Sequence, residues 1–218
     1  MCGIAGLIHK GKTVNIGKEI QDMLQALKHR GPDSTGYALY GEGSNGDYIM
    51  RFKVGENVGE GSSAVNEDKS IYDSRKKQVD SHLKELGAQI VKEDQLTPYS
   101  FRYIIKYDKD LMEFSKKIES VKMTEILSLG KSLELVKDLG DANTVSKQYG
   151  LDKIKGTHAI GHSRMATESG VDIRSAHPFW GYPFSDMSVV HNGQLTSYWN
   201  SRRALERKGM RFMSECDS

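Results

Sequence analysis

The chain has 218 residues, 37% of them hydrophobic, enough to bury the core of one domain or of one domain with a small insertion. Its net charge is only +2, from 31 basic and 29 acidic residues, which argues against binding to nucleic acid or to an anionic membrane. No apolar run approaches the ~20 residues of a membrane span, and the N-terminal charges follow the apolar residues, the reverse of a signal peptide. We therefore predict a cytoplasmic protein.

The first section of the chain predicts a strand, a helix and a hairpin. Residues 3–9 form a short apolar run typical of a buried strand. Apolar residues then recur at helical spacing over residues 16–28, with Asn15 as the N-cap, and Pro32 ends the helix. Residues 35–41 and 47–53 alternate in polarity and predict a hairpin.

The middle of the chain predicts a small α+β unit. Residues 55–70 are rich in glycine and polar residues and indicate a loop. The pattern then predicts a helix over 73–86, strands over 88–93 and 99–107, a helix over 109–121 and a strand over 124–129. The segment LELVKDLG could complete a ferredoxin-like unit, so residues 55–155 are predicted to be an inserted subdomain. The basic residues 75–77 are expected on a solvated helix face.

The last section, residues 156–218, returns to strands that end in polar motifs. Residues 197–208 predict a helix, with Thr196 as its N-cap and Gly209 just past its end. The aromatic residues Trp180, Tyr182 and Phe184 are expected to cover the edge of the core rather than to bind a cofactor.

Cysteine and histidine spacing gives no sign of a metal. Cys2 and Cys216 lie at opposite ends and are expected to be free thiols in a reducing compartment. Three histidines, His162, His177 and His191, could suggest a metal, but no carboxylate lies at ligand spacing on the same element. We predict no metal site.

Cys2 is a candidate nucleophile. If Met1 is removed, Cys2 carries a free α-amino group, whose usual pKa of ~7.7–8.0 makes it a base within reach of the thiol. This is the N-terminal-amine route to an activated nucleophile. Position alone favours a small buried residue that leads a strand.

Three further motifs could serve such a nucleophile. The Asn192 side chain and the Gly193 N–H, after an apolar strand, could stabilise an oxyanion, although Asn-Gly is also a common turn. Arg164, at a strand end, could bind a carboxylate or form an ordinary salt bridge. Asp217 could bind an ammonium group or be an exposed tail residue.

Taken together and in order, four motifs resemble one family. They are MCGIAG, HRGPDS at 29–34, GHSRMAT at 161–167 and HNG at 191–193. This order resembles the class II glutamine amidotransferases, which are N-terminal nucleophile hydrolases with a four-layer αββα sandwich. The resemblance covers residues 2–54 and 156–218, which would form the amidotransferase domain. The family fold normally continues past the equivalent of Ser218, so the sandwich is expected to be incomplete at its C-terminus.

The resemblance implies a role for each matching residue. Cys2 would be the nucleophile and, through its amine, the base, with Asn192 and Gly193 as the oxyanion hole. The substrate, L-glutamine, would be bound by Arg164 at its carboxylate and by Asp217 at its amino group. The remaining implied residues are Thr167 and His177 in the same pocket and Arg30 and Asp33 in a structural loop behind the nucleophile.

A finer resemblance concerns the partners. The insertion and residues 167–178 look more like the amidotransferase component of archaeal-type glutamate synthases and N-methylglutamate synthases. In those systems FMN and iron–sulfur functions lie elsewhere, so this chain is expected to hold no cofactor and to meet FMN-dependent synthase and ferredoxin-like partner subunits. Met165 and Glu168 depart from residues common in the family, Trp and His.

Three alternatives remain open from the sequence. The HRGPD loop also occurs in asparagine synthetases, so this could be an amidotransferase domain of that kind. The fold could instead survive as a non-catalytic regulatory or binding module, which requires that Met1 be retained. An amidase acting on a different amide is disfavoured by the combination of Arg164 and Asp217.

Overall fold

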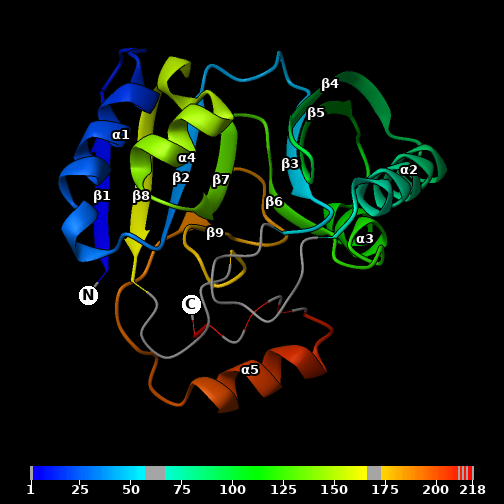
Figure 1. Ribbon diagram of the computed structural model, residues 1–218. Coiled ribbons are helices and arrows are strands. Elements are labelled where there is room, and N and C mark those ends of the chain that lie inside the picture. Colours follow the sequence, from blue (N-terminus) through cyan, green and yellow to red (C-terminus); the bar gives the residue numbers. More distant parts are fainter. Residues whose placement is uncertain are drawn as a thin grey trace.

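The protein is a mixed α/β structure built on two antiparallel sheets of four strands each (Figure 1). The computed structural model describes residues 2–56, 67–165 and 173–210, together with 212, 214, 216 and 217. Within these ranges no helix is both long enough and apolar enough to span a bilayer.

The first sheet has the order β1-β8-β2-β7 and comes from distant parts of the chain. Its strands are β1 (Gly3–Ile8), β8 (Gly156–Arg164), β2 (Ser34–Gly41) and β7 (Leu133–Leu139). The helices α1 (Ile16–Ala26) and α4 (Ala142–Tyr149) cover one face of it. Apolar residues at helical spacing make α1 amphipathic, and its fully buried residues Ile16, Ile20 and Leu24 pack on this face.

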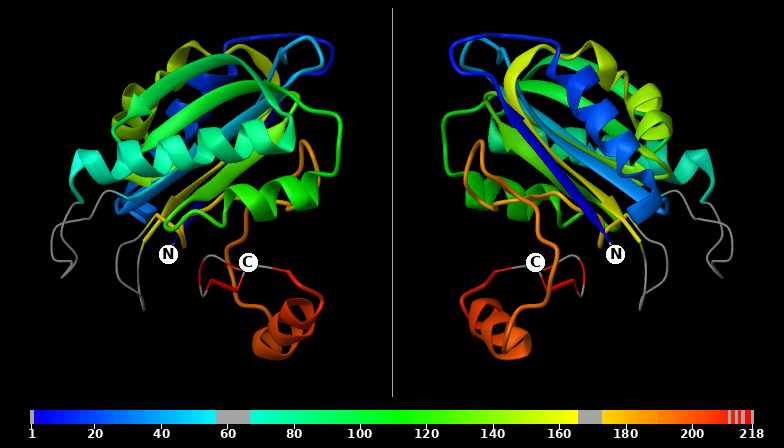
Figure 2. Two further views of the ribbon diagram at one scale, coloured as in Figure 1. Left: turned by 90° about the vertical axis from the view of Figure 1, so that its right-hand side faces the viewer. Right: turned by 90° about the vertical axis from the view of Figure 1, so that its left-hand side faces the viewer.

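The second sheet has the order β4-β5-β3-β6. Its strands are β4 (Gln89–Thr97), β5 (Ser100–Lys106), β3 (Tyr48–Lys53) and β6 (Glu125–Gly130). The helices α2 (Lys69–Leu86) and α3 (Leu111–Ile118) pack on it through an aromatic-rich core that includes Phe52, Phe101 and Phe114. Figure 2 shows the two helix pairs on opposite sides of the molecule.

The two sheets meet through apolar and charged contacts. A small cluster joins Ala38 of β2 and Leu135 of β7 to Leu127 of β6. Beside it, the buried Glu134 carboxylate of β7 accepts hydrogen bonds from Arg51 Nε at 2.8 Å and Arg102 Nε at 2.7 Å. Since β6 and β7 follow one another in the chain but belong to different sheets, their connection also ties the sheets together.

The remaining elements are two short 3-10 helices, η1 (Lys28–Arg30) and η2 (Leu151–Lys153), the paired strands β9 (Phe179–Trp180) and β10 (Ser188–Val189), and α5 (Tyr198–Arg207). In Figure 1, α5 and the C-terminal residues lie below the two sheets. This end of the molecule carries the candidate site.

Most expected elements are present, with local corrections. Asn15 caps α1 as predicted, its Oδ1 accepting the N–H of Lys18 at 3.2 Å. The helix near the C-terminus is α5, but its N-cap is Ser197 in the left-handed region rather than Thr196. The first strand was expected to be buried, yet β1 is an edge strand with Ile8 77% exposed. Arg75 was expected on a solvated face but is buried, because its guanidinium donates to Val54 O.

The pairing of strands differs from the expectation. β2 and β3 were predicted to form a hairpin, but β2 pairs with β7 and β8, whereas β3 pairs with β5 and β6. The segment LELVKDLG was expected to complete a ferredoxin-like unit, but as β7 it joins the first sheet instead. Residues 55–155 therefore contribute strands to both sheets, and β3, from the predicted amidotransferase part, lies inside the second sheet. The predicted boundary does not separate the sheets.

Candidate active site

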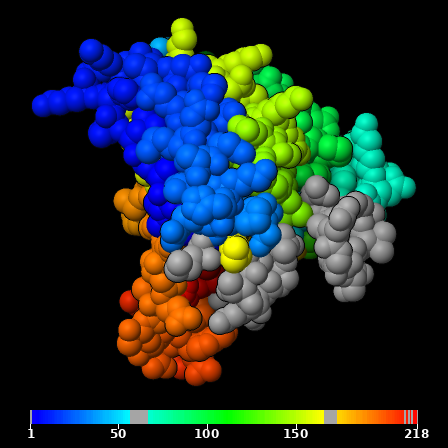
Figure 3. All heavy atoms as spheres, turned by 60° about the vertical axis from the view of Figure 1, so that its left-hand side comes forward, coloured from blue at the N-terminus to red at the C-terminus, as the bar shows by residue number. Residues whose placement is uncertain are grey.

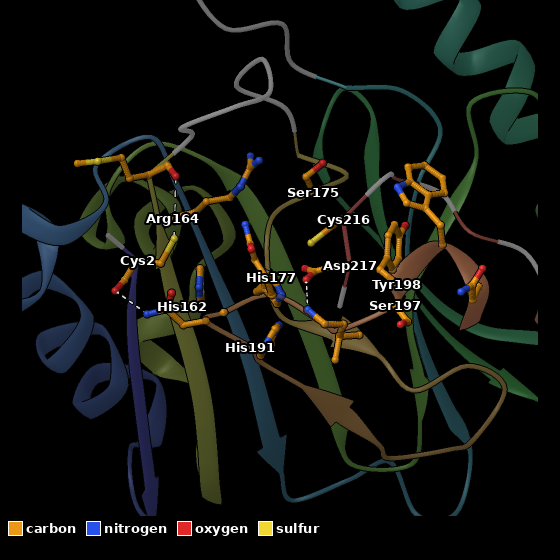
Figure 4. Close-up of a pocket in the computed structure, with 17 residues that line it drawn as sticks. Cys2, His162, Arg164, Ser175, His177, His191, Ser197, Tyr198, Cys216 and Asp217 are labelled. Atoms are coloured by element: carbon orange, nitrogen blue, oxygen red, sulfur yellow. Dashed lines mark hydrogen bonds between the residues drawn. The ribbon is translucent and has the colours of Figure 1, made fainter. Parts of the chain in front are cut away.

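A cavity of about 730 Å³ lies where β1 begins and β8 ends. Its lining comes from those two strands, from the segments around β9 and β10, from the start of α5 and from the C-terminal residues. Figure 3 shows α5 projecting from the body beyond the β1 region, and Figure 4 shows the lining side chains. Among the predicted site residues, the cavity is lined by Cys2, Arg164, His177, Asn192, Gly193 and Asp217.

Cys2 is held at the rim of the cavity by its main chain. Its carbonyl oxygen accepts hydrogen bonds from Arg30 Nε and from Asn192 Nδ2, both at 3.2 Å. Its half-buried thiol donates a weak hydrogen bond to Met165 O, with 3.9 Å between Sγ and the oxygen. Two segments that are distant in sequence thus fix the backbone of one residue and leave its side chain at the cavity.

The loop behind Cys2 packs directly on the end of β8. A Cβ at Gly31 would lie 2.5 Å from the carbonyl carbon of Arg164, so only glycine allows this approach. The next contact is a hydrogen bond from Asp33 N to Arg164 O at 3.2 Å. Arg30 and Asp33 therefore lie beside Cys2 and the strand that carries Arg164.

Arg164 and His162 lie two residues apart on β8 and both line the cavity. Because side chains alternate between the faces of a strand, residues at this spacing share one face. The neighbouring strand β1 is in register so that Gly3 pairs with Ser163 and Ile4 with His162, which brings Cys2 to the same end.

His177 packs against His162 over the middle of the first sheet. The two rings are 4.7 Å apart between centroids, and Phe179 meets the other side of His177 at 4.6 Å. A Cβ at Gly36 of β2 would lie 2.0 Å from His177 O, so the segment carrying His177 rests directly on that strand. Burial and the nearby Arg164 charge lower the pKa of His162 to about 4, and burial beside His162 lowers the pKa of His177 to about 3. Both rings are neutral at neutral pH.

The segment after β10 and the C-terminal residues close the far side of the cavity. Asp217 Oδ2 accepts the N–H of Leu195 at 2.6 Å. A Cβ at Gly193 would lie 2.9 Å from His191 Nε2, so glycine lets the His191 ring lie against the backbone there. In the view of Figure 4 the three histidines lie between Cys2 and Asp217.

Several lining residues were not assigned to the site from sequence. His162 and His191 were considered as motif members and as possible metal ligands but not as site residues, and Ser175, Tyr198 and Cys216 were not singled out as site residues. The two-residue alternation on β8 could have placed His162 beside Arg164. Both cysteines are free thiols, as predicted, but the fold brings Cys216 to the same cavity as Cys2. Thr167 lies outside the described residues.

The described part of the chain holds no group of three or more His, Cys, Asp or Glu side chains that could bind a metal ion. His162, His177 and His191 all line the cavity, yet within those residues no carboxylate joins them in such a group. The prediction that this chain needs no metal or cofactor remains a prediction.

Comparison with known proteins identifies the family, although no protein-family model matches the chain. A protein of Methanothermobacter thermautotrophicus named as a glutamine amidotransferase is 37% identical over 228 residues, covering 100% of this chain and 69% of the relative. Amidophosphoribosyltransferase 2 of Arabidopsis thaliana is 33% identical over 93 residues, or 42% of this chain and 17% of that protein. The chain belongs to the class II glutamine amidotransferases. It is therefore an enzyme of the glutaminase or amidotransferase type, as the motifs predicted.

A second amidotransferase relative also aligns along the whole chain. The glutamine amidotransferase-like protein GlxB of Rhizobium meliloti is 30% identical over 223 residues, covering 100% of this chain and 67% of the relative. The chain thus spans about two thirds of the length of both relatives, and their matches include residues 55–155.

Proposed function

We propose that this amidotransferase hydrolyses the side-chain amide of L-glutamine through a thioester on Cys2, and that the ammonia serves a partner synthase. The observation that carries the proposal is the convergence of Cys2, Arg164, Asn192 and Asp217 on one cavity from four separate segments. These residues supply a nucleophile, a cation, an amide donor and an anion, which are the groups that a zwitterionic amide substrate requires.

The reaction begins at the Cys2 thiol. Once Met1 is removed, the α-amine of Cys2 takes the thiol proton, and Sγ attacks the carboxamide carbon. The Asn192 amide carries two N–H groups, so it can hold Cys2 O and also donate to the developing oxyanion together with the Gly193 N–H. Collapse of the tetrahedral adduct breaks the C–N bond, and the amine returns the proton to the departing ammonia. Water then cleaves the thioester to glutamate.

The two ends of the cavity suit the α-carbon substituents of glutamine. Arg164 provides a planar guanidinium for the α-carboxylate, and Asp217 provides a carboxylate for the α-ammonium. His177 lines the same cavity, and Thr167 completes the proposed set from the GHSRMAT motif.

The fold proposal follows from the layers. We propose that the two sheets, with helix pairs on opposite sides, are an αββα sandwich of the N-terminal nucleophile hydrolase type. In this proposal residues 2–54 and 156–218 form the amidotransferase domain, and residues 55–155 are the inserted part. Residues 55–155 are not a free-standing subdomain, because β7 is a strand of the first sheet and α4 covers one face of that sheet.

The proposed partners follow from the finer resemblance. We propose that the protein is cytoplasmic and delivers ammonia to an FMN-dependent, glutamate synthase-type subunit with ferredoxin-like subunits. The support is the likeness of the insertion and of residues 167–178 to the amidotransferase component of such synthases. Co-purification of the native complex, followed by identification of its subunits and flavin, tests this assignment.

Replacing Cys2 tests the reaction. Cys2→Ala should reduce glutamine hydrolysis to background, a loss on the order of 10⁴-fold or more, because no other group replaces the nucleophile. A glutamine-analogue electrophile should label Cys2 and not Cys216 in the parent protein, as located by peptide mass spectrometry. Intact mass is measured first, because the α-amine is free only when Met1 is absent.

Two outcomes would reject the proposal. An active Cys2→Ala protein would show that another group performs the reaction. Retention of Met1 in protein from its native host, with no hydrolysis, would favour the non-catalytic binding module instead.

A further inference from the structure

The histidine pair His162–His177 has hydrogen-bonding groups that no described residue of the protein uses. Both residues are more than nine-tenths buried, at 1% and 6% exposed. Among the residues that the structure describes, none hydrogen-bonds to a ring nitrogen of either histidine, although buried polar atoms in proteins almost always have a partner. Both side chains line the cavity, so a molecule bound there can supply partners for these nitrogens.

The chemistry of the pair can be counted without knowing the tautomers. A neutral imidazole carries one N–H donor and one acceptor nitrogen. The pair therefore presents two donors and two acceptors. Of the groups proposed to hold the substrate, Arg164, Asn192 and Gly193 donate, and Asp217 accepts at the α-ammonium end. The N–H groups of the substrate carboxamide would still need an acceptor.

The geometry of β8 places one histidine at a suitable distance. His162 and Arg164 are two residues apart on one face, which is a spacing of about 6.8 Å along an antiparallel strand. In extended glutamine, four C–C bonds separate the α-carboxylate carbon from the carboxamide carbon, which is roughly 5 Å. The register of β1 brings Cys2 level with Arg164, so His162, two residues back on the same face of β8, borders the cavity beside a glutamine that is held by Arg164 and attacked at Cys2.

We infer that His162 accepts a hydrogen bond from the carboxamide N–H of bound glutamine and so favours the amide substrate over glutamate. This inference rests on the proposed function. His177 contacts the rings of both His162 and Phe179, and it acts as a positioning residue that holds the His162 ring in place. Glutamate at neutral pH has a carboxylate in place of the amide and offers no N–H there, so it leaves the acceptor of His162 unfilled.

Binding to the Cys2→Ala protein separates this role from catalysis. Calorimetric titration gives the dissociation constants of glutamine and glutamate, and their ratio measures the preference for the amide. His162→Phe in this background should weaken glutamine binding by about tenfold and glutamate binding much less, because only glutamine loses a hydrogen bond. His162→Asn keeps an acceptor and should retain part of the preference.

The matched control is His158→Phe. His158 lies on the same face of β8, but its ring stacks on that of Tyr40, with 4.0 Å between the ring centroids, and it does not line the cavity. It should change neither dissociation constant. If His162→Phe does not fold, as judged by circular dichroism and thermal midpoint, His162→Leu replaces it in the comparison with His162→Asn.

The results distinguish the inference from the function on which it rests. A folded His162→Phe protein with an unchanged preference, or with equal weakening of both ligands, would overturn the role of His162. Failure of the Cys2→Ala protein itself to bind glutamine would instead count against the proposed substrate.

Discussion

At the scale of single residues, the active site depends on close backbone contacts as much as on reactive groups. The segment with His177 rests on β2 at Gly36, and the loop with Arg30 rests on β8 at Gly31. Neither glycine has a φ in the left-handed region. Glycine is therefore required there because a Cβ atom would clash with the neighbouring backbone, and not because of the backbone conformation. The position of the histidine pair thus depends on the absence of one Cβ atom in the neighbouring strand.

Gly36→Ala should therefore destabilise the protein and displace His177. The added Cβ would lie 2.0 Å from His177 O and 2.9 Å from Pro178 Cδ, so backbone must move. We expect a loss of about 1–3 kcal/mol in the free energy of unfolding, typical of overpacking, together with weaker glutamine binding. Thermal unfolding and calorimetric titration measure the two effects.

Gly6→Ala on β1 is the control for this substitution. Its Cβ would meet Ile160 Cγ2 at 3.4 Å, which is an ordinary contact. Equal stability of the Gly36 and Gly6 variants would show that the His177 segment moves aside without cost.

At the scale of elements, the turn between β6 and β7 is stabilised by an aspartate from far along the chain. Asp186 Oδ1 accepts the N–H groups of Ser132 and Leu133, both at 2.8 Å, and Oδ2 accepts that of Lys131 at 3.0 Å. Gly130 permits this approach, because a Cβ there would lie 2.5 Å from Asp186 Oδ1. Partial burial raises the pKa of Asp186, but these N–H donors outweigh it and hold the pKa below its usual value.

Asp186→Ala should destabilise this turn and the segment that leads into β10. Three backbone N–H groups lose their acceptor, although water reaches this half-buried site, so we expect about 1–2 kcal/mol of lost stability in denaturant unfolding. Asp108→Ala, at an exposed loop position, should change stability little. Identical midpoints for the two variants would contradict the role of Asp186.

At the scale of the whole molecule, Glu134 links the two sheets. Burial alone would raise the pKa of its carboxyl, but the Arg51 and Arg102 guanidinium groups outweigh burial and lower the pKa to about 2. Its pKa in the unfolded chain is near the ordinary 4.5. A carboxyl whose folded pKa is lowered contributes stability above the unfolded pKa, and this contribution is lost as pH falls through the folded pKa.

Glu134→Gln should therefore be destabilising by about 3–5 kcal/mol at neutral pH, the usual cost of removing one partner from a buried ion pair. The difference from the parent protein should shrink between pH 4.5 and about 2, where the parent carboxyl becomes protonated. Denaturant unfolding across this range measures it. Glu42→Gln, on the surface, should show no such difference, and a pH-independent effect of Glu134→Gln would rule out the charge as its cause.

Local patterns predicted the elements well because they act over a few residues. The helical spacing of Ile16, Ile20 and Leu24 and the cap at Asn15 are properties of one short segment, and α1 forms where they predict it. The same holds for α2, α3 and α5, although the exact cap of α5 depends on its surroundings. The order of the four motifs was enough to identify the family.

The sequence by itself thus determined the family and most of the helices and strands, although it did not predict α4, and its assignment of chemistry to the residues around Cys2 stays a prediction. Only the tertiary structure decided that β2 pairs with β7 and β8, and that β7 leaves the middle segment to complete the first sheet. Strand alternation has the same period in every strand, so it does not specify a partner, which is selected by contacts between distant segments. Those same contacts bring His162 and Cys216 to the cavity of Cys2 and leave the His162–His177 pair without hydrogen-bond partners in the part of the chain that the structure describes.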